Sequence, residues 1–174
     1  MKHFALILFL PAALAALEEK ETIRQNYAAA ARLEIRNVNG AVRVTGSARG
    51  DFQVVVHRRI EAKDSAAMEQ AKREVRLEAD ASGGRLKLCV TGPGNDCTDE
   101  SKGGCRGDCR REYSVRYEFE VEAPQSVAAD VKTVNGGVAV RTIGGEVSAR
   151  TVNGGVTLED VGAASTAQTV NGAV

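Results

Sequence analysis

The C-terminal part of the chain is a repeat of nine residues, and this repeat constrains the fold more than any other feature. From Thr133 the sequence divides into TVNGGVAVR, TIGGEVSAR, TVNGGVTLE, DVGAASTAQ and TVNGAV. The second position is always Val or Ile, the fourth is always Gly or Ala, and the sixth and eighth are mostly apolar. A fixed period of this kind is typical of proteins built from stacked structural units.

The repeat alternates between two kinds of bend. Asn-Gly recurs every 18 residues, whereas the intervening units carry Gly-Gly or Gly-Ala. Two unlike bends in alternation predict a structural unit of 18 residues with two strands. We therefore predict an all-β fold, a β-solenoid (β-helix-like) with 18-residue coils of two nonapeptide strands, plus one short helix and a disulfide-bearing loop. The predicted bend residues are Asn39, Gly40, Asn135, Gly136, Gly144, Gly145, Asn153, Gly154, Asn171 and Gly172.

An antiparallel meander is the competing fold, because Asn-Gly between two apolar runs is a strong hairpin signal. Val138 and Val140 share one face of a strand, but Ile143 has the opposite parity and would point to the other face of a straight strand. A bend near residues 141–142 would return Ile143 to the core, which favours the solenoid. Stacked coils would also place the asparagines of successive coils in a column with a spacing of about 4.8 Å.

A further copy of the nonad lies far upstream, at residues 37–45, with Leu33 and Ile35 in the apolar positions of a unit before it. We therefore predict a single domain over residues 18–174. Its predicted parts are a first coil at residues 32–45, inserted strands, a helix and a Cys loop at 46–123, and repeats at 124–174. The last nonad is incomplete and carries no cap, so we expect the chain to be truncated or another subunit to cover this end.

Residues 1–17 have the composition of a signal peptide. A basic start precedes an uncharged, mostly apolar stretch from Phe4 to Leu17, and charged residues follow abruptly. This stretch is short for a membrane span, and Ala13-Leu14-Ala15 supplies a small-residue cleavage site. We predict an exported protein of the periplasm, the cell surface or the extracellular space, with an uncleaved membrane anchor as the alternative.

The middle of the chain predicts strands and one helix. Asp64 or Ser65 is a natural N-cap, and the residues after it are good helix formers with a small apolar stripe. Ser82-Gly83-Gly84 separates two apolar runs and predicts a hairpin. The predicted strands are Phe52–Ile60, Val75–Ala81, Arg85–Val90 and the half-buried Tyr113–Glu122.

Cys89, Cys97, Cys105 and Cys109 lie in or beside a polar loop over residues 91–112. In an exported protein, four cysteines predict two disulfide bonds. Of the three connectivities we prefer Cys89–Cys109 with Cys97–Cys105, because Cys89 and Cys109 flank the two strands that close the loop. A metal site is the alternative, but the spacing contains no C-x2-C pair, and the repeat lacks the aspartate of calcium-binding nonapeptides. We therefore predict no metal.

The composition argues against several classes of function. Lys plus Arg equals Asp plus Glu at 23 each, whereas proteins that bind nucleic acids usually carry a basic excess. Aromatic residues make up only 4%, which leaves little for stacking against bases or sugars. After export only His57 remains for imidazole chemistry, and no nucleophile-elbow motif accompanies it. We predict no catalytic residue, no cofactor and no nucleic-acid partner.

The order of these parts resembles the bacterial putative-adhesin family, a domain-of-unknown-function group of envelope proteins with β-strand repeats. The resemblance implies a β-solenoid at the envelope and no established catalytic residues, and the cysteine-bearing loop departs from the family pattern. It rests on Leu33–Val44, the Ala66–Val75 helix region, Glu122–Val127 and Val131–Val174, which together cover nearly the whole mature chain.

These features predict a non-enzymatic exported envelope or cell-surface protein, either a β-repeat scaffold or an adhesin-like binding module. Its partner would be an envelope or surface macromolecule, a protein or a glycan. One alternative is a self-assembling surface polymer that associates through the open C-terminal coil. The other is a carbohydrate-active β-helix enzyme, but such enzymes need paired carboxylates on one face, and the repeats offer mostly Thr, Ser and Ala with scattered Arg.

Overall fold

A computed structural model of the chain describes residues 16–93, 95, 97, 111–162 and 164–174. These residues form twelve β-strands and one α-helix. No helix in this part of the chain is long and apolar enough to cross a membrane. The elements are β1 (Leu17–Tyr27), β2 (Arg32–Arg36), β3 (Val42–Ser47), β4 (Phe52–Ala62), α1 (Ser65–Glu74), β5 (Arg76–Ser82), β6 (Arg85–Thr91), β7 (Tyr113–Pro124), β8 (Ala128–Lys132), β9 (Val138–Arg141), β10 (Val147–Asn153), β11 (Val156–Glu159) and β12 (Ser165–Asn171).

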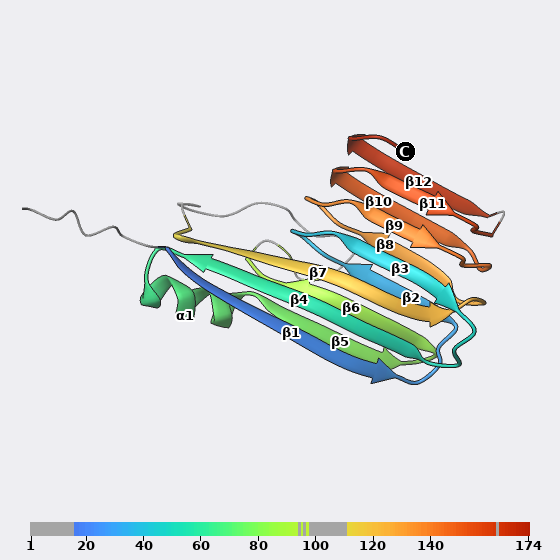
Figure 1. Ribbon diagram of the computed structural model, residues 1–174, viewed down its shortest axis with the longest axis horizontal. Coiled ribbons are helices and arrows are strands. Elements are labelled where there is room, and N and C mark those ends of the chain that lie inside the picture. The colour runs from blue at the N-terminus through green and yellow to red at the C-terminus, as the bar shows by residue number, and fades with distance from the viewer. Residues whose placement is uncertain (1–15, 94, 96, 98–110, 163) are drawn as a thin grey trace, which may run out of the picture.

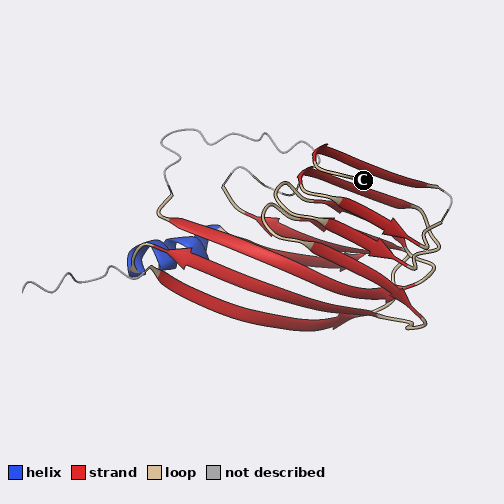
Figure 2. Ribbon diagram, turned by 45° about the horizontal axis from the view of Figure 1, so that its top comes forward, coloured by secondary structure: helices blue, strands red, loops and turns tan. Residues whose placement is uncertain are grey.

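The strands form two six-stranded sheets that pack face to face around one apolar core (Figure 1). Sheet A has the strand order β1-β4-β7-β3-β9-β11, and sheet B has the order β12-β10-β8-β2-β6-β5. Helix α1 lies at one end of the molecule against β4 and β7 (Figure 2). Alternate residues of the strands fill the space between the sheets, and Phe52, Tyr117 and Phe119 are the largest of the fully buried side chains.

The prediction of a β-solenoid is wrong, because both sheets are mixed. In sheet A, β1, β4 and β7 pair antiparallel, and in sheet B, β5 pairs antiparallel with β6. The segment predicted as an insertion contains strands of up to 12 residues, longer than a nonad can supply. These strands pair with each other and with the repeat strands, so they extend both sheets instead of interrupting a coil. The chain therefore folds as two layers of mixed sheet.

The repeat strands themselves pair in parallel, and their 18-residue period sets the register. Val147 of β10 pairs with Ala129 of β8 and with Ser165 of β12, each 18 residues away in the sequence. In sheet A, β9 pairs in the same way with β11. The upstream copy of the nonad joins this arrangement, because β2 and β3 pair with β8 and β9. The repeats therefore do not form an antiparallel meander.

The middle of the chain contains the predicted elements, and one strand was not predicted. Strand β4, the β5–β6 hairpin and the half-buried β7 are confirmed. The side chain of Asp64 accepts a hydrogen bond from the amide of Ala67 over 2.8 Å, which confirms it as the helix N-cap. Strand β1 pairs along its whole length with β4, but its sequence is too polar to alternate. Only the pairing with β4 makes this segment a strand.

The Asn-Gly bends bring successive layers of the repeat into backbone contact. A Cβ atom on Gly154 would lie 2.3 Å from the carbonyl oxygen of Gly136, and one on Gly172 would lie 1.9 Å from that of Gly154. Gly154 also has a φ of +154°, which residues with a side chain rarely adopt. Glycine is therefore required here by the close approach of two backbones as well as by conformation.

The opposite bends combine the same close approach with left-handed residues other than glycine. Thr142 and Asp160 lie 18 residues apart and have φ values of 57° and 52°, the left-handed conformation. A Cβ atom on Gly145 would lie 2.2 Å from the carbonyl oxygen of Val127, so close approach also operates here. The sequence predicted a bend at residues 141–142 and identified Gly145, but it did not predict the left-handed conformation of Thr142 and Asp160, because Gly is the residue that this conformation favours most.

We expect Gly154→Ala to lower the free energy of unfolding by about 1–3 kcal/mol, because the added methyl group must displace a backbone carbonyl. Gly155→Ala is the matched control, since its Cβ would lie at an ordinary 3.5 Å from the carbonyl oxygen of Ala173. The control should change stability by less than about 0.5 kcal/mol. Urea unfolding followed by circular dichroism measures both, and equal stabilities of the two variants would contradict the close contact.

A disulfide bond joins Cys89 to Cys97. The preferred pairing of Cys89 with Cys109 is therefore wrong, whereas the prediction that Cys89 and Cys97 form disulfides is confirmed. Cys89 lies near the end of β6, and Cys97 follows it by 8 residues, so the bond closes a short loop at the end of the strand. The Cα atoms of the bonded pair are 6.0 Å apart. Cys105 and Cys109 lie outside the described residues.

Peptide mapping distinguishes the observed pairing from the one preferred on sequence grounds. Trypsin cuts after Lys87 and Lys102, so Cys89 and Cys97 fall in one peptide, while Cys109 falls in another. We expect the unreduced peptide of residues 88–102 to appear alone in the mass spectrum and to gain two hydrogens on reduction. A covalent pair of peptides 88–102 and 107–110 would contradict the Cys89–Cys97 bond.

Candidate binding site

Three of the four residues in each Thr-Val-Asn-Gly bend have contacts inside the molecule. The hydroxyl of Thr151 donates to the carbonyl oxygen of Gly136 over 2.9 Å, and the hydroxyl of Thr169 donates to that of Gly154 over 2.8 Å. Each threonine therefore ties its own layer to the preceding one. The glycine allows the close approach described above, so both positions are explained by internal structure.

The asparagines of the bends form a hydrogen-bonded ladder. The Nδ2 of Asn135 donates to Oδ1 of Asn39 over 2.8 Å. The same bond joins Asn153 to Asn135 over 2.8 Å, and Asn171 to Asn153 over 2.9 Å. At the other end of the ladder, the Nδ2 of Asn39 donates to the carbonyl oxygen of Val115 over 3.4 Å. All four asparagines therefore serve one continuous internal contact.

The valines of the bends, by contrast, face solvent. Val134 is 39% exposed, Val152 is 38% exposed and Val170 is 73% exposed. They lie side by side in adjacent layers of the repeat, and the half-buried Val38 extends the line by one layer. Ile143, which holds the same position in the intervening unit of the repeat, is fully buried. We call the four residues Val38, Val134, Val152 and Val170 the valine row.

Internal packing does not explain the valine row. A β-branched residue suits a strand, but threonine would meet that requirement while exposing less apolar surface. Contiguous exposed apolar side chains on a soluble domain commonly mark an interaction site. The valines are therefore the members of the bend that are best explained by contact with another molecule.

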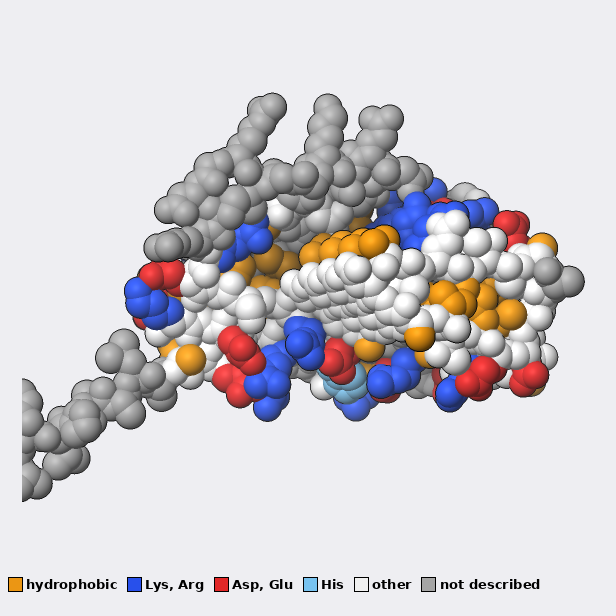
Figure 3. Space-filling view, turned by 90° about the horizontal axis from the view of Figure 1, so that it is seen from above, with side chains coloured by type: hydrophobic (Ala, Val, Ile, Leu, Met, Phe, Trp, Pro, Cys, Tyr) orange, Lys and Arg blue, Asp and Glu red, His pale blue; other side chains and the backbone are white. Residues whose placement is uncertain are grey.

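A row of basic side chains runs beside the valine row. Arg36 pairs in register with Lys132, and Lys132 with Arg150. Each of these residues stands two positions before a member of the valine row, so the two rows share the outer face of sheet B. Seen from above, a line of hydrophobic side chains lies beside a group of Lys and Arg side chains (Figure 3). We call these three residues the basic row.

The charges of the basic row are held in place by neighbours. The Nη2 of Arg36 lies 2.8 Å from Oδ2 of Asp130, and its Nη1 donates to the backbone carbonyl of Asp130 over 3.0 Å. Both side chains of this ion pair are only 11–13% exposed. The Nε of Arg150 donates to Oε1 of Gln168 over 2.8 Å, which aligns the guanidinium along the sheet. These contacts hold the guanidinium groups of Arg36 and Arg150 beside the valine row.

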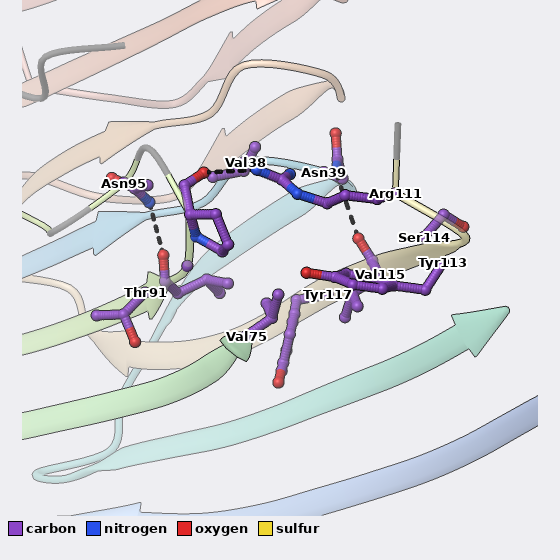
Figure 4. Close-up of a pocket in the computed structure, with 13 residues that line it drawn as sticks. Val38, Asn39, Val75, Thr91, Asn95, Arg111, Tyr113, Ser114, Val115 and Tyr117 are labelled. Carbon is purple, nitrogen blue, oxygen red and sulfur yellow. Dashed lines mark hydrogen bonds between the residues drawn. The ribbon is translucent and has the colours of Figure 1, made fainter. Parts of the chain in front are cut away.

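A pocket of about 250 Å³ lies beyond Val38, where the two sheets part (Figure 4). Sheet A contributes the start of β7, and sheet B contributes the end of β6 with the turn that follows it. Arg111 lies on the same side of the pocket as Asn39, and its Nη2 donates to the carbonyl oxygen of Pro93 over 3.2 Å. The described residues that line the pocket are Val38, Asn39, Val75, Val90, Thr91, Gly92, Pro93, Asn95, Arg111, Tyr113, Ser114, Val115 and Tyr117.

The two tyrosines of the pocket are anchored outside it. The hydroxyl of Tyr113 donates to the carboxylate of Glu74 at the end of α1, and this bond lowers the pKa of the Glu74 carboxyl. Burial raises the pKa of the Tyr117 hydroxyl, which interacts with Arg58. The aromatic rings therefore present their apolar parts to the pocket, while their hydroxyls are engaged elsewhere.

His57 lies on the opposite side of the molecule, on the outer face of sheet A. Its Nδ1 is 3.1 Å from the hydroxyl of Thr22, and its Nε2 is 4.0 Å from Oε2 of Glu120. A hydroxyl and a carboxylate thus flank the imidazole, the three kinds of group found in a hydrolase triad. However, β4 is paired with β1 on one side and β7 on the other, so its amides are used within the sheet and are not directed at an oxyanion.

The described residues contain no group of three or more His, Cys, Asp or Glu side chains placed to hold a metal ion. The predicted bend residues Asn39, Asn135, Asn153 and Asn171 come together in the ladder, and their glycines lie beneath it. Sequence analysis missed both the valine row and the pocket. The constant Val at the second position of the Asn-Gly units was a visible signal for the valine row. Nothing local in the sequence indicates the pocket.

Comparison with known proteins finds resemblance only among solved structures. No protein-family model matches the sequence, and no curated protein sequence matches it. A putative cell adhesion protein from Clostridium sporogenes is 11% identical, with a TM-score of 0.34, over 83% of this chain and 72% of that one. A putative adhesin from Bacteroides fragilis is 10% identical, with a TM-score of 0.36, over 88% of this chain and 60% of that one.

A putative lipid binding protein from Parabacteroides distasonis is also similar, at 12% identity and a TM-score of 0.35. The matches cover 86% of this chain but only 59% of that protein, so this chain spans well under two thirds of its length. The resemblance to bacterial putative adhesins that the sequence motifs indicated is thus found again among solved structures.

Proposed function

We propose that this protein is a non-enzymatic binding module of the cell envelope, exported by means of residues 1–17. The valine row, flanked by the basic row, forms its contact surface. The observation that carries the proposal is the exposure of Val134, Val152 and Val170 in bends whose other residues all serve internal contacts.

The shape and chemistry of this surface favour a protein partner over a glycan. Its side chains repeat at the spacing of adjacent strands, about 4.8 Å, and so form a straight, narrow track. The track offers aliphatic and cationic groups, and the valine row and basic row contain no aromatic ring on which a sugar could stack. An extended segment with apolar and acidic side chains on one face would match both rows.

The arrangement around His57 supports a role without catalysis. The three side chains lie on an open sheet surface, and none of them lines the pocket described above. An acyl-transfer site needs donors aimed at the developing oxyanion as well as a nucleophile and a base. The exported module therefore acts by binding.

Replacing Val134, Val152 and Val170 together by Ser should weaken binding of the mature protein to isolated bacterial envelopes by at least about 10-fold, because three apolar contacts are lost. Co-sedimentation at several protein concentrations measures this affinity. Ala139→Ser with Thr157→Ser, on the outer face of sheet A, is the control and should bind as the wild type does. Unchanged binding by the valine variant would contradict the proposed surface.

Export has a separate test. Expression of the full chain in a bacterial host should release a protein that begins between residues 16 and 18, as read by intact-mass spectrometry of the periplasmic fraction. Ile7→Arg places a charge in the apolar stretch and should hold the full-length chain inside the cell. A full-length wild-type chain that stays in the membrane would instead establish the uncleaved anchor.

A further inference from the structure

The side of the sandwich that β1 and β5 form is open. Strand β1 is the last strand of sheet A at this side, and β5 is the last strand of sheet B (Figure 1). Ala79 of β5 pairs in register with Leu88, so both side chains share the face directed toward the core. Leu88 is fully buried, whereas Ala79 is exposed, and Ala81 on the same face is exposed as well.

Strand β1 shows the same lack of cover on the opposite sheet. Ile23 and Tyr27 point toward the core but are only half-buried, and Gln25 between them is exposed. The backbone amide of Ala31, just after β1, donates to the carbonyl oxygen of Gly84 over 2.9 Å. The end of β1 therefore lies near the turn that follows β5. We call the four apolar residues of this region the open side: Ile23, Tyr27, Ala79 and Ala81.

The backbone of β5 offers hydrogen-bonding groups along the open side. Among the strands that the structure describes, β5 pairs only with β6. An edge strand directs half of its N–H and C=O groups away from its one neighbour, and an extended peptide can pair with them. We propose that β5 binds an extended polypeptide segment as an added antiparallel strand, in which apolar and basic residues alternate.

The open side sets the residues of the added strand that face inward. Side chains directly opposite each other on two paired strands share one face of the sheet. Residues opposite Ala79 and Ala81 would therefore point toward sheet A, where Ile23 and Tyr27 are half-buried. The small alanine side chains leave room for larger neighbours. Apolar residues at these positions would cover both strands of the open side.

The other face of β5 sets the charge of the added strand. Glu78 and Asp80 are exposed on this face. Oδ2 of Asp80 lies 3.4 Å from Nη2 of Arg85, and Oε1 of Glu78 accepts a hydrogen bond from the hydroxyl of Thr91 over 3.3 Å. The ion pair with Arg85 is solvent-exposed and therefore weak. Opposite charges across adjacent strands stabilise a sheet, so the residues opposite Glu78 and Asp80 are basic.

The same two acids disfavour a second copy of this chain as the added strand. When two β5 strands pair antiparallel over their full length, Glu78 of one copy lies opposite Asp80 of the other. Like charges directly opposite each other destabilise a sheet. The partner is therefore a different segment with basic residues at these positions.

The test titrates ¹⁵N-labelled mature protein at low ionic strength with the capped peptide Lys-Val-Lys-Val-Lys-Val. We expect a dissociation constant on the order of 0.1 mM and shifts of the amide signals of β5. The β5 amides that point away from β6 should exchange more slowly with solvent when the peptide is bound. Glu-Val-Glu-Val-Glu-Val keeps the apolar face and should bind about 10-fold more weakly. Lys-Lys-Lys-Val-Val-Val keeps the composition without the alternation and should not protect the amides.

Charge reversal locates the interaction. Glu78→Lys with Asp80→Lys should reverse the preference, so that the glutamate peptide binds about 10-fold more tightly than the alternating lysine peptide. Glu118→Lys with Glu120→Lys is the matched control, because these two acids have the same spacing on β7, which is paired on both sides. This control should bind both peptides as the wild type does.

Three results would overturn the proposal: equal affinity for the lysine and glutamate peptides, no protection of the β5 amides, or equal effects of the β5 and β7 charge reversals. Concentration-dependent shifts of the β5 amides without peptide would instead identify a second copy as the partner and would also overturn it. The inference is independent of the valine row, which lies in bends that do not include β5. The variant with serine at Val134, Val152 and Val170 should therefore bind the lysine peptide normally, whatever its affinity for envelopes.

Discussion

The contact of one backbone with the next at the glycine bends is the constraint on which the repeat half of this protein depends. A Cβ atom on Gly154 would lie 2.3 Å from the carbonyl oxygen of Gly136, so the layers can stack only where a side chain is missing. Once they stack, the residues of each 18-residue period fall into rows. The asparagine ladder then follows from the register, because identical side chains are placed at hydrogen-bonding distance, and each threonine hydroxyl reaches a glycine carbonyl oxygen of the preceding layer.

Strand β7 connects this regular half to the antiparallel half. It pairs in parallel with β3 on one side and antiparallel with β4 on the other. Because β7 is 12 residues long and β3 only six, the start of β7 extends beyond the parallel strands. The pocket lies at that overhang, between β7 and the end of β6. The mixed sheets thus produce a feature that stacked repeats alone would not contain.

The valine row and the pocket differ in shape. The valine row lies on the outer face of a sheet, is straight and is open along its length, as contact with an extended macromolecule requires. The pocket is concave and is lined from both sheets.

The sequence by itself determined the β-rich class, the 18-residue period, the bend glycines, the N-cap at Asp64 and the strands β4, β5, β6 and β7, because each depends on local chemistry or spacing. It could not determine the mixed sheets, since the same repeat strands can stack as coils or join longer antiparallel strands. The sequence of β1 has no alternation of apolar and polar residues. Val134 is exposed and Ile143 is buried although both hold the second position of the repeat, because they occupy different bends. The partner of Cys89 also depended on where β6 ends. Pairing between segments far apart in the chain decided these features, and such pairing is set by packing across the core, which only the tertiary structure contains.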